Sequence, residues 1–427
     1  MIYLPSYRNT KPHPHICGHS SPGLHHFNFT TSPESTQRPA KMADSRSPVV
    51  DVHTHMYPPE YITLLTTRTA IPLVRTFPGS PDPRLILLEA ELPLLEKALS
   101  GECSGQLPGR PLTKDYASLP QKLHFMSAHG IDISVLSLAN PWLDFLPPST
   151  AVSFAQTIAS SFETSCAANP GKLYFFAALP LTAPIPDLLA FIPTLLNLSH
   201  CRGVILGTTG LGQGLDDPDL LPVFEALAAA SLPIFLHPHY GLPNSVFGPA
   251  AARGEYGHVL PLALGFPMET TIAVTRMFLS GVFDKVPSLR MILAHSGGTL
   301  PFLAGRIESC ILHDAHLAAE YQKSGKDKKR RTIWEVLEEQ VYLDAVVYSA
   351  VGLKAAIMAS GEWGSERLMF GTDHPFFPPV GDDEGNEKWE SVGLNRTAVA
   401  MVLGEGSKVG QMVMGGNAVR VLRLDEE

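Results

Sequence analysis

The sequence predicts an α/β protein built as a single (β/α)8 barrel, and three observations predict it. Short apolar segments alternate with amphipathic ones along the chain, as expected when strands and helices take turns around a closed parallel sheet. The chain has 427 residues, a length that such barrels reach as one unit. Several of the apolar segments also end in His or Asp, at the strand ends where barrels carry their active sites.

Each expected strand is a short apolar segment bounded by turn-forming residues. The expected strands are Val49–His55, Ile133–Leu138, Leu173–Leu179, Arg202–Leu206, Pro233–His237, Arg290–Ala294, Val341–Ala345 and Arg367–Gly371. Amphipathic periodicity predicts helices between them, at Tyr116–Ala128, Thr150–Ala168, Asp187–Leu198, Leu221–Ala230, Glu269–Phe283, Leu300–His313, Ile333–Glu339 and Val351–Ala359.

The composition is that of an ordinary globular protein. Hydrophobic residues make up 44% of the chain, and the formal net charge is -9 with acids and bases scattered. This pattern predicts no nucleic-acid surface, and no apolar run is long enough to cross a bilayer. The five cysteines are far apart and lack a CxxC spacing, which favours a reducing, cytoplasmic compartment over a disulfide framework.

Two segments depart from the alternating pattern. Residues 1–47 are rich in Pro, Ser, Thr and His without apolar periodicity, so we expect a disordered extension ahead of a single barrel domain at 48–427. Met42 is a plausible alternative start, which leaves the natural presence of residues 1–41 open. Residues 58–118 form a proline-dense insertion, with a helix expected at Leu85–Leu99, that we place over the barrel mouth.

The first strand carries a His-x-His pair. Residues two apart in a strand project from the same face, so His53 and His55 point the same way and supply half of a metal site. Taken alone, this motif is more often just two polar residues at a strand end than half of a metal site. However, His237, His295 and Asp373 end the fifth, sixth and eighth strands. The shared position at C-terminal strand ends predicts a metal centre.

The pattern resembles the amidohydrolase superfamily from about Val49 onward. The segments AHSGG at 294–298 and FGTDHP at 370–375 are similar to its decarboxylase branch, whose best-known member acts on aminocarboxymuconate semialdehyde. Four further segments resemble the fungal isoorotate (5-carboxyuracil) decarboxylases: VHTHMYPP at 52–59, LPGRP at 107–111, SLANPW at 137–142 and DHPFFPP at 373–379. The resemblance includes the insertion and leaves out the tail before Met42.

The resemblance implies one metal ion per subunit. Binuclear members place a bridging lysine or carboxylate at the end of strand four, where this chain has ILGT at 205–208 and no side chain that can bridge. The expected site is therefore mononuclear zinc held by His53, His55, His237 and Asp373, with positions open for water or substrate. Imidazole-rich sets favour zinc, although ligand type alone leaves manganese and iron open.

The resemblance also implies the substrate contacts. Asp373 is the expected acid that protonates the ring carbon, and His295 is expected to bind substrate and set the protonation of Asp373. Arg110 would pair with a substrate carboxylate or carbonyl, Asn140 with an imide edge, and Phe376 with the ring face. Simpler interpretations stay open, because an arginine between prolines is often a loop anchor and Phe376 is also typical of an apolar lid.

The expected function is zinc-dependent, non-oxidative decarboxylation of 5-carboxyuracil to uracil and carbon dioxide in pyrimidine salvage. One alternative is a related decarboxylase of another hydroxyaromatic or muconate acid. A second is a hydrolase in which zinc-bound hydroxide attacks an amide or lactone. A third is a non-catalytic scaffold, against which an open ligand set argues. The expected partners are the small carboxylated substrate and further copies of this chain, as a homodimer or larger, with no nucleic acid or membrane.

Overall fold

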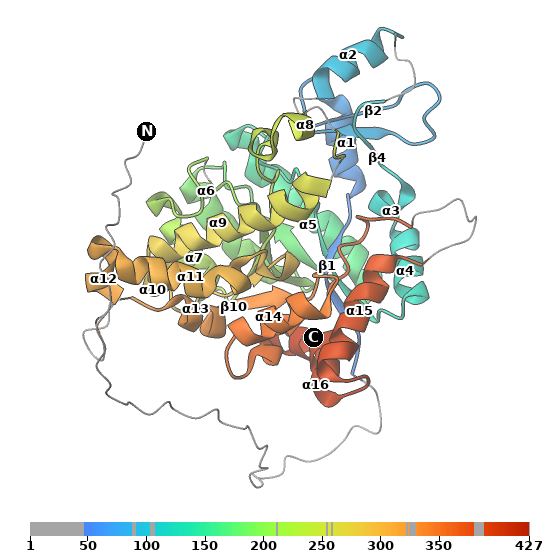
Figure 1. Ribbon diagram of the computed structural model, residues 1–427. Coiled ribbons are helices and arrows are strands. Elements are labelled where there is room, and N and C mark those ends of the chain that lie inside the picture. Colours follow the sequence, from blue (N-terminus) through green and yellow to red (C-terminus); the bar gives the residue numbers. More distant parts are fainter. Residues whose placement is uncertain are drawn as a thin grey trace, which may run out of the picture. The chain divides into compact units, whose positions relative to one another are not determined.

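Eight parallel strands form one sheet at the centre of the computed structural model, in the order β1-β5-β6-β7-β8-β9-β10-β11 (Figure 1). The strands are β1 (Val50–His55), β5 (Ile133–Ser137), β6 (Leu173–Ala178), β7 (Cys201–Leu206), β8 (Ile234–Leu236), β9 (Met291–Leu293), β10 (Val341–Asp344) and β11 (Leu368–Met369). The backbone N–H of Val52 donates to Phe370 O at 3.1 Å, and that of His55 donates to His374 O at 2.8 Å. These bonds join the first strand to the last and confirm the predicted (β/α)8 barrel.

The structure describes residues 47–87, 91–102, 107–210, 212–252, 255–257, 259–321, 323, 330–379 and 388–426. The predicted N-terminal extension lies outside these ranges, apart from its last residue. Within them, no helix is both long enough and apolar enough to cross a membrane.

Helices surround the sheet and connect successive strands (Figure 1). The main connecting helices are α4 (Leu119–Ala128), α5 (Pro148–Ala167), α6 (Ile185–Thr194), α7 (Leu221–Ala229), α9 (Phe266–Leu279), α11 (Leu300–His313), α13 (Ile333–Glu339) and α14 (Ala350–Ala359). Three shorter helices lie in the connections: α8 (Pro249–Ala252) between β8 and α9, α10 (Val282–Lys285) between α9 and β9, and α12 (Ala315–Tyr321) between α11 and α13. The chain ends in α15 (Glu390–Leu403), α16 (Lys408–Gln411) and α17 (Asn417–Leu422).

The strands are buried on both faces, which explains why they are nearly continuous apolar runs. All six residues of β6 are buried, among them Phe175 and Phe176, and Phe176 packs against Phe235 of β8 with ring centroids 5.4 Å apart. Polar side chains therefore stand out where they occur. In β1 they are Asp51, His53, Thr54 and His55, and all four are fully buried.

The insertion after β1 forms a small unit at one end of the barrel, drawn in blue in Figure 1. It contains α1 (Pro59–Thr67), α2 (Leu92–Leu99), α3 (Lys114–Ala117) and an antiparallel sheet of β2 (Leu73–Arg75), β3 (Arg84–Ile86) and β4 (Arg110–Pro111). Leu73, Phe77, Ile86 and Leu95 make a hydrophobic cluster of its own, separate from the main core. The pairing of Leu85 with Arg110 fixes the position of β4.

Two predicted helices were partly wrong. The expected helix at Leu85–Leu99 begins only at Leu92, and its first residues instead form β3. Short apolar runs do not distinguish helix from strand, and Pro93 is suited only to a helix start. The expected helix at Tyr116–Ala128 is interrupted at Ser118, whose side chain accepts from Gln121 N and caps a new helix.

The C-terminal helices close the N-terminal end of the barrel by packing on the start of β1. A Cβ on Gly415 would overlap Pro48 O, so Gly415→Ala should force the backbone apart and lower the free energy of unfolding by about 2 kcal/mol. Gly393→Ala is the matched control, because a Cβ there meets nothing within 4 Å and alanine favours its helix. Urea denaturation of both variants measures the difference, and equal stability would contradict the packing argument.

Candidate metal centre and active site

Strand β1 places two imidazoles side by side at the C-terminal end of the barrel. The rings of His53 and His55 lie 5.1 Å apart, centroid to centroid. Each ring is oriented through its Nδ1: His53 Nδ1 donates to Asp344 Oδ2 at 2.6 Å, and His55 Nδ1 bonds Ser137 Oγ at 2.9 Å. Because Nδ1 is occupied in both rings, each presents Nε2 to the barrel axis.

His237 and Asp373 complete the cluster from β8 and β11. His237 Nδ1 donates to Pro238 O at 2.8 Å, which again leaves Nε2 free. Asp373 follows β11 in a left-handed backbone conformation with φ 59°, and its N–H donates to His53 O at 2.7 Å. One atom from each of His53, His55, His237 and Asp373 lies within 4.8 Å of the others. The structure thus brings together the four predicted metal ligands.

The donor atoms of this cluster suit a metal ion. The Nε2 atoms of His53, His55 and His237 and Oδ1 of Asp373 are all buried without a hydrogen-bond partner among the described residues. Leaving so many polar atoms unsatisfied in one place is costly unless a ligand joins them. Three imidazole nitrogens and one carboxylate oxygen form a set that zinc and manganese both accept.

The electrostatics of the cluster prepare it for a cation. Burial alone would lower the pKa of His53, but Asp373 and Asp344 outweigh it and raise that pKa to about 10. Burial lowers the pKa of His55 to about 4 and holds that of His237 well below its ordinary value. Burial raises the pKa of Asp373, but His53 and contacts from His295 and His55 outweigh it and hold that pKa well below its usual range. In the metal-free protein His53 is therefore protonated, and its positive charge balances the carboxylates as a metal cation would.

His295 lies beside the four ligands, as the sequence predicted. Its Nε2 is 3.5 Å from Asp373 Oδ2, whereas the nearest imidazole to Oδ1 is that of His53, with Nε2 at 3.2 Å. Asp373 therefore divides its two oxygens, Oδ1 toward the metal ligands and Oδ2 toward His295. The backbone of His295 is held in a left-handed conformation, and its N–H donates to Asp344 Oδ2 at 3.0 Å.

The sequence analysis missed Asp344, which organises two parts of the site. Besides the bond to His53, its carboxylate accepts the backbone N–H groups of His295 and Ser296, and the Ser296 hydroxyl donates to its backbone O at 2.6 Å. Asp344 is the last residue of β10, and an aspartate at a strand end was a signal available in the sequence.

A buried network behind the ligands holds β1 to the loop that carries Asp373. Asp51 accepts from Thr372 Oγ1 at 2.7 Å and Thr372 N at 3.0 Å. Lys122 of α4 is fully buried, and its Nζ donates to Thr54 Oγ1 at 2.7 Å and to His374 Nδ1. Burial lowers the pKa of Lys122 to about 7, against the field of Asp51. Thr54, Thr372 and His374, which are neighbours of the ligands in the sequence, are thus held in place by Asp51 and Lys122. Neither of these two residues is one of the four ligands.

On the side of the insertion, β4 directs Arg110 toward the site. Arg110 Nη2 donates to Tyr57 OH at 2.5 Å, and its guanidinium lies 4.8 Å from the Phe376 ring centroid and 5.0 Å from that of Tyr116. Its Nε is buried and has no hydrogen-bond partner among the described residues. The Phe376 ring also packs edge-on against His55 at 5.6 Å. Phe376 is therefore in contact with a metal ligand, and Arg110 lies against Phe376.

Asn140 lies close by but is partly engaged. Its Nδ2 donates to His239 O at 2.8 Å, and its backbone O accepts from Tyr57 OH at 2.6 Å. One amide proton is therefore already in use, and the side chain retains its oxygen and second proton for a ligand. The end of β7 offers no metal ligand, because Thr208 Oγ1 donates to Glu269.

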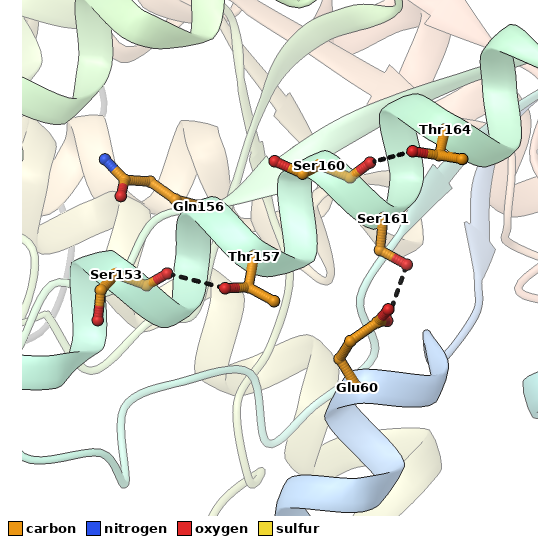
Figure 2. Close-up of a pocket in the computed structure, with 7 residues that line it drawn as sticks. All are labelled: Glu60, Ser153, Gln156, Thr157, Ser160, Ser161 and Thr164. Atoms are coloured by element: carbon orange, nitrogen blue, oxygen red, sulfur yellow. Dashed lines mark hydrogen bonds between the residues drawn. The ribbon is translucent and has the colours of Figure 1, made fainter.

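A separate groove of ≈ 450 Å³ lies between α1 and α5 and contains none of the predicted site residues. Figure 2 shows that its lining is mostly hydroxyl groups, together with Glu60. Thr157 and Thr164 donate to the helix carbonyls of Ser153 and Ser160, and Ser161 donates to Glu60. Four of the five hydroxyl groups bond to helix carbonyls or to Glu60. None of the residues that line the groove is a predicted metal ligand or substrate contact.

Comparison with known proteins agrees with this site. IDCase of Metarhizium anisopliae, an isoorotate decarboxylase whose crystal structure is known in the apo form, is 64% identical with a TM-score of 0.84; the match covers 90% of this chain and 100% of that chain. The 2-amino-3-carboxymuconate-6-semialdehyde decarboxylase of Dictyostelium discoideum is 26% identical over 71% of this chain and 76% of its own length.

A dihydroxybenzoic acid decarboxylase from Polaromonas sp. JS666, crystallised with bound manganese, has the same fold at 20% identity and a TM-score of 0.59; the match covers 89% of this chain and 98% of that chain. The resemblance to isoorotate decarboxylases seen in the sequence motifs is confirmed. The family model for amidohydrolases matches residues 50–424, nearly the whole described part of the chain. This protein belongs to the amidohydrolase family and is one of its decarboxylases.

Proposed function

We propose that this protein removes the carboxylate of 5-carboxyuracil to give uracil and carbon dioxide, with one zinc ion per subunit, as a step of pyrimidine salvage in the cytoplasm. The observation that carries the proposal is the division of the Asp373 carboxylate, with one oxygen among the metal ligands and the other facing His295. The 64% identity to Metarhizium IDCase supports the choice of substrate.

The metal site lies where the proposed chemistry needs it. His53, His55, His237 and Asp373 would hold a divalent ion, which would supply Lewis-acid polarisation to a substrate carboxylate and a neighbouring carbonyl oxygen. Arg110 would place its unpartnered Nε against an anionic or carbonyl oxygen, and Phe376 would cover the flat ring. Asn140 would use its remaining amide groups on the imide edge.

The proton is handled by Asp373 and His295. Asp373 rests as a carboxylate because its pKa is held well below the usual range. We propose that Oδ2 takes a proton from His295 Nε2 and passes it to the ring carbon that bears the carboxylate. The carbon–carbon bond then breaks, its electron pair returns to the ring, and carbon dioxide leaves. The proton consumed is replaced from solvent, so atoms and charge balance.

The substrate is tested with a small panel on purified, metal-loaded protein. We expect carbon dioxide and uracil from 5-carboxyuracil, and far slower turnover of orotate, salicylate-type acids and aminocarboxymuconate semialdehyde. Ring opening without carbon dioxide release would indicate a hydrolase. Preferential turnover of the semialdehyde, the substrate named for the Dictyostelium relative, would favour that acid instead.

Homo-oligomer formation is part of the proposal. Phe302 on α11 is 83% exposed, and Val351 and Met358 on the adjacent α14 are each 80% exposed. Exposed apolar side chains on two neighbouring helices favour burial against another copy. A monomer by light scattering would contradict this part of the proposal.

Metal removal should abolish activity, and His53 should take up a proton as the cation leaves. Because the pKa of His53 is about 10 without metal, metal binding at neutral pH must displace that proton, so affinity should rise with pH up to about 10. Calorimetry in buffers of different ionisation enthalpy should show about one proton released per ion bound. We expect zinc to restore the most activity; higher activity with manganese would contradict the choice of zinc, and proton uptake would contradict the assignment to His53.

Asp373→Asn should lower kcat by about a thousandfold, because an amide cannot carry the proton to the ring carbon. Metal content is measured alongside, since the substitution also changes a ligand. Asp219→Asn replaces an exposed carboxylate in the same way and should leave kcat unchanged. Near-normal turnover by metal-loaded Asp373→Asn would remove Asp373 as the proton donor.

Arg110→Ala should raise KM by about thirtyfold, as expected for the loss of a hydrogen bond to a charged group. Arg110→Lys keeps the charge without the planar fork, so it should recover only part of the loss. Steady-state kinetics on the carboxylated substrate measures both. An unchanged KM in the alanine variant would show that Arg110 anchors the insertion only.

A further inference from the structure

Tyr348 carries a buried hydroxyl group that the fold leaves unused. The residue follows β10 by four positions, in the loop between Asp344 and α14 at the C-terminal end of the barrel. Its OH is buried and has no hydrogen-bond partner among the described residues. A buried hydroxyl without a partner costs stability, which phenylalanine at the same place would not. Folding alone therefore does not explain the hydroxyl.

The surrounding chain holds Tyr348 firmly in place. Its backbone is in a left-handed conformation with φ 55°, which is uncommon for an aromatic residue and has to be imposed by neighbours. Asn395 of α15 imposes it: the Asn395 Oδ1 accepts Tyr348 N at 2.9 Å and Val347 N at 3.3 Å. The Asn395 Nδ2 donates to Gly371 O at 3.2 Å, which ties the Tyr348 loop to the end of β11, two residues before Asp373.

The hydroxyl lies on the Asp373 side of the site. The Tyr348 ring packs edge-on against Phe377, in the loop that follows Asp373, with centroids 6.1 Å apart. Burial raises the pKa of Tyr348 and the fields of Asp373 and Asp344 raise it further, so the hydroxyl keeps its proton. It is therefore available as a donor beside carboxylates to which it is not itself bonded.

The reaction chemistry indicates which substrate group such a donor would meet. In the proposed function, on which this inference rests, Asp373 protonates the ring carbon that bears the carboxylate. That carbon must then lie beside Asp373, and its carboxylate with it. As an anion, this carboxylate accepts a hydrogen bond strongly, and it becomes a weak acceptor only when it leaves as neutral carbon dioxide. Arg110 and Tyr348 contact different residues of the loop that follows Asp373. Arg110 lies against Phe376, whereas Tyr348 packs against Phe377.

We propose that Tyr348 is a further substrate-binding residue, whose hydroxyl donates a hydrogen bond to the carboxylate that leaves as carbon dioxide. It distinguishes the carboxylated substrate from the product, which lacks that group. Tyr348 would therefore contribute to binding of the substrate and not to retention of uracil.

The test compares Tyr348→Phe with Tyr174→Phe, which are the same chemical change in opposite settings. The Tyr174 OH, near the N-terminal end of β6, donates to Leu424 O at 2.7 Å. Tyr174→Phe should therefore lower the melting temperature and leave kcat/KM unchanged. Tyr348→Phe should keep or raise the melting temperature, lower kcat/KM for 5-carboxyuracil about tenfold, and leave the inhibition constant of uracil unchanged.

Three outcomes would overturn the proposal. An unchanged kcat/KM would show that the hydroxyl does not meet substrate. Equal weakening of uracil and 5-carboxyuracil would place it against the ring. A Tyr348→Phe protein that fails to fold, or melts markedly lower, would show that the hydroxyl has a structural partner. Failure of the proposed function is separate, since it appears as no carbon dioxide from the unsubstituted enzyme.

Discussion

The closing contact between the first and last strands of the barrel is the constraint on which the site depends. Val52 bonds to Phe370 and His55 to His374, and Asp373 bonds back to His53 through its own N–H. More than three hundred residues separate the two strands in the sequence, and these backbone bonds, together with the Asp51 and Lys122 side chains, bring their ligands together. Because hydrogen bonding in a parallel sheet fixes the register of neighbouring strands, the backbone brings the imidazoles and the carboxylate to the same end of the barrel.

The second requirement is electrostatic. Asp51, Asp344 and Asp373 are almost completely buried in one region, a density of carboxylates that no apolar core tolerates unpaired. Backbone and hydroxyl donors satisfy Asp51, and the His53 proton or a metal ion satisfies the other two. The shifted pKa values of His53 and Asp373 have a single origin, since each side chain is the main charged neighbour of the other. The carboxylates of Asp344 and Asp373 therefore need a positive charge between them, either the proton on His53 or a metal ion.

Much of this could be predicted from the sequence, because the relevant signals were local. The eight strands and the ligands His53, His55, His237 and Asp373 are visible as apolar runs ending in metal-binding residue types, and the structure assembles them as predicted. The role of Asp344 depends on which imidazole its strand end faces, and that is a property of the closed barrel. The same holds for Tyr348, since no pattern in the sequence indicates that a hydroxyl will lack a partner. The helix expected at Leu85–Leu99 was partly wrong because periodicity in a short apolar run is ambiguous.

The insertion has a consequence for how such an enzyme can change. Arg110 is carried on a sheet with its own hydrophobic cluster, braced by Glu91, which accepts the N–H groups of Gly109 and Leu87. None of these supports touches the metal ligands. Substitutions in the insertion can therefore change which acid binds while the metal ligands at the strand ends stay in place. Substrate selectivity and catalytic reactivity can then evolve at different rates.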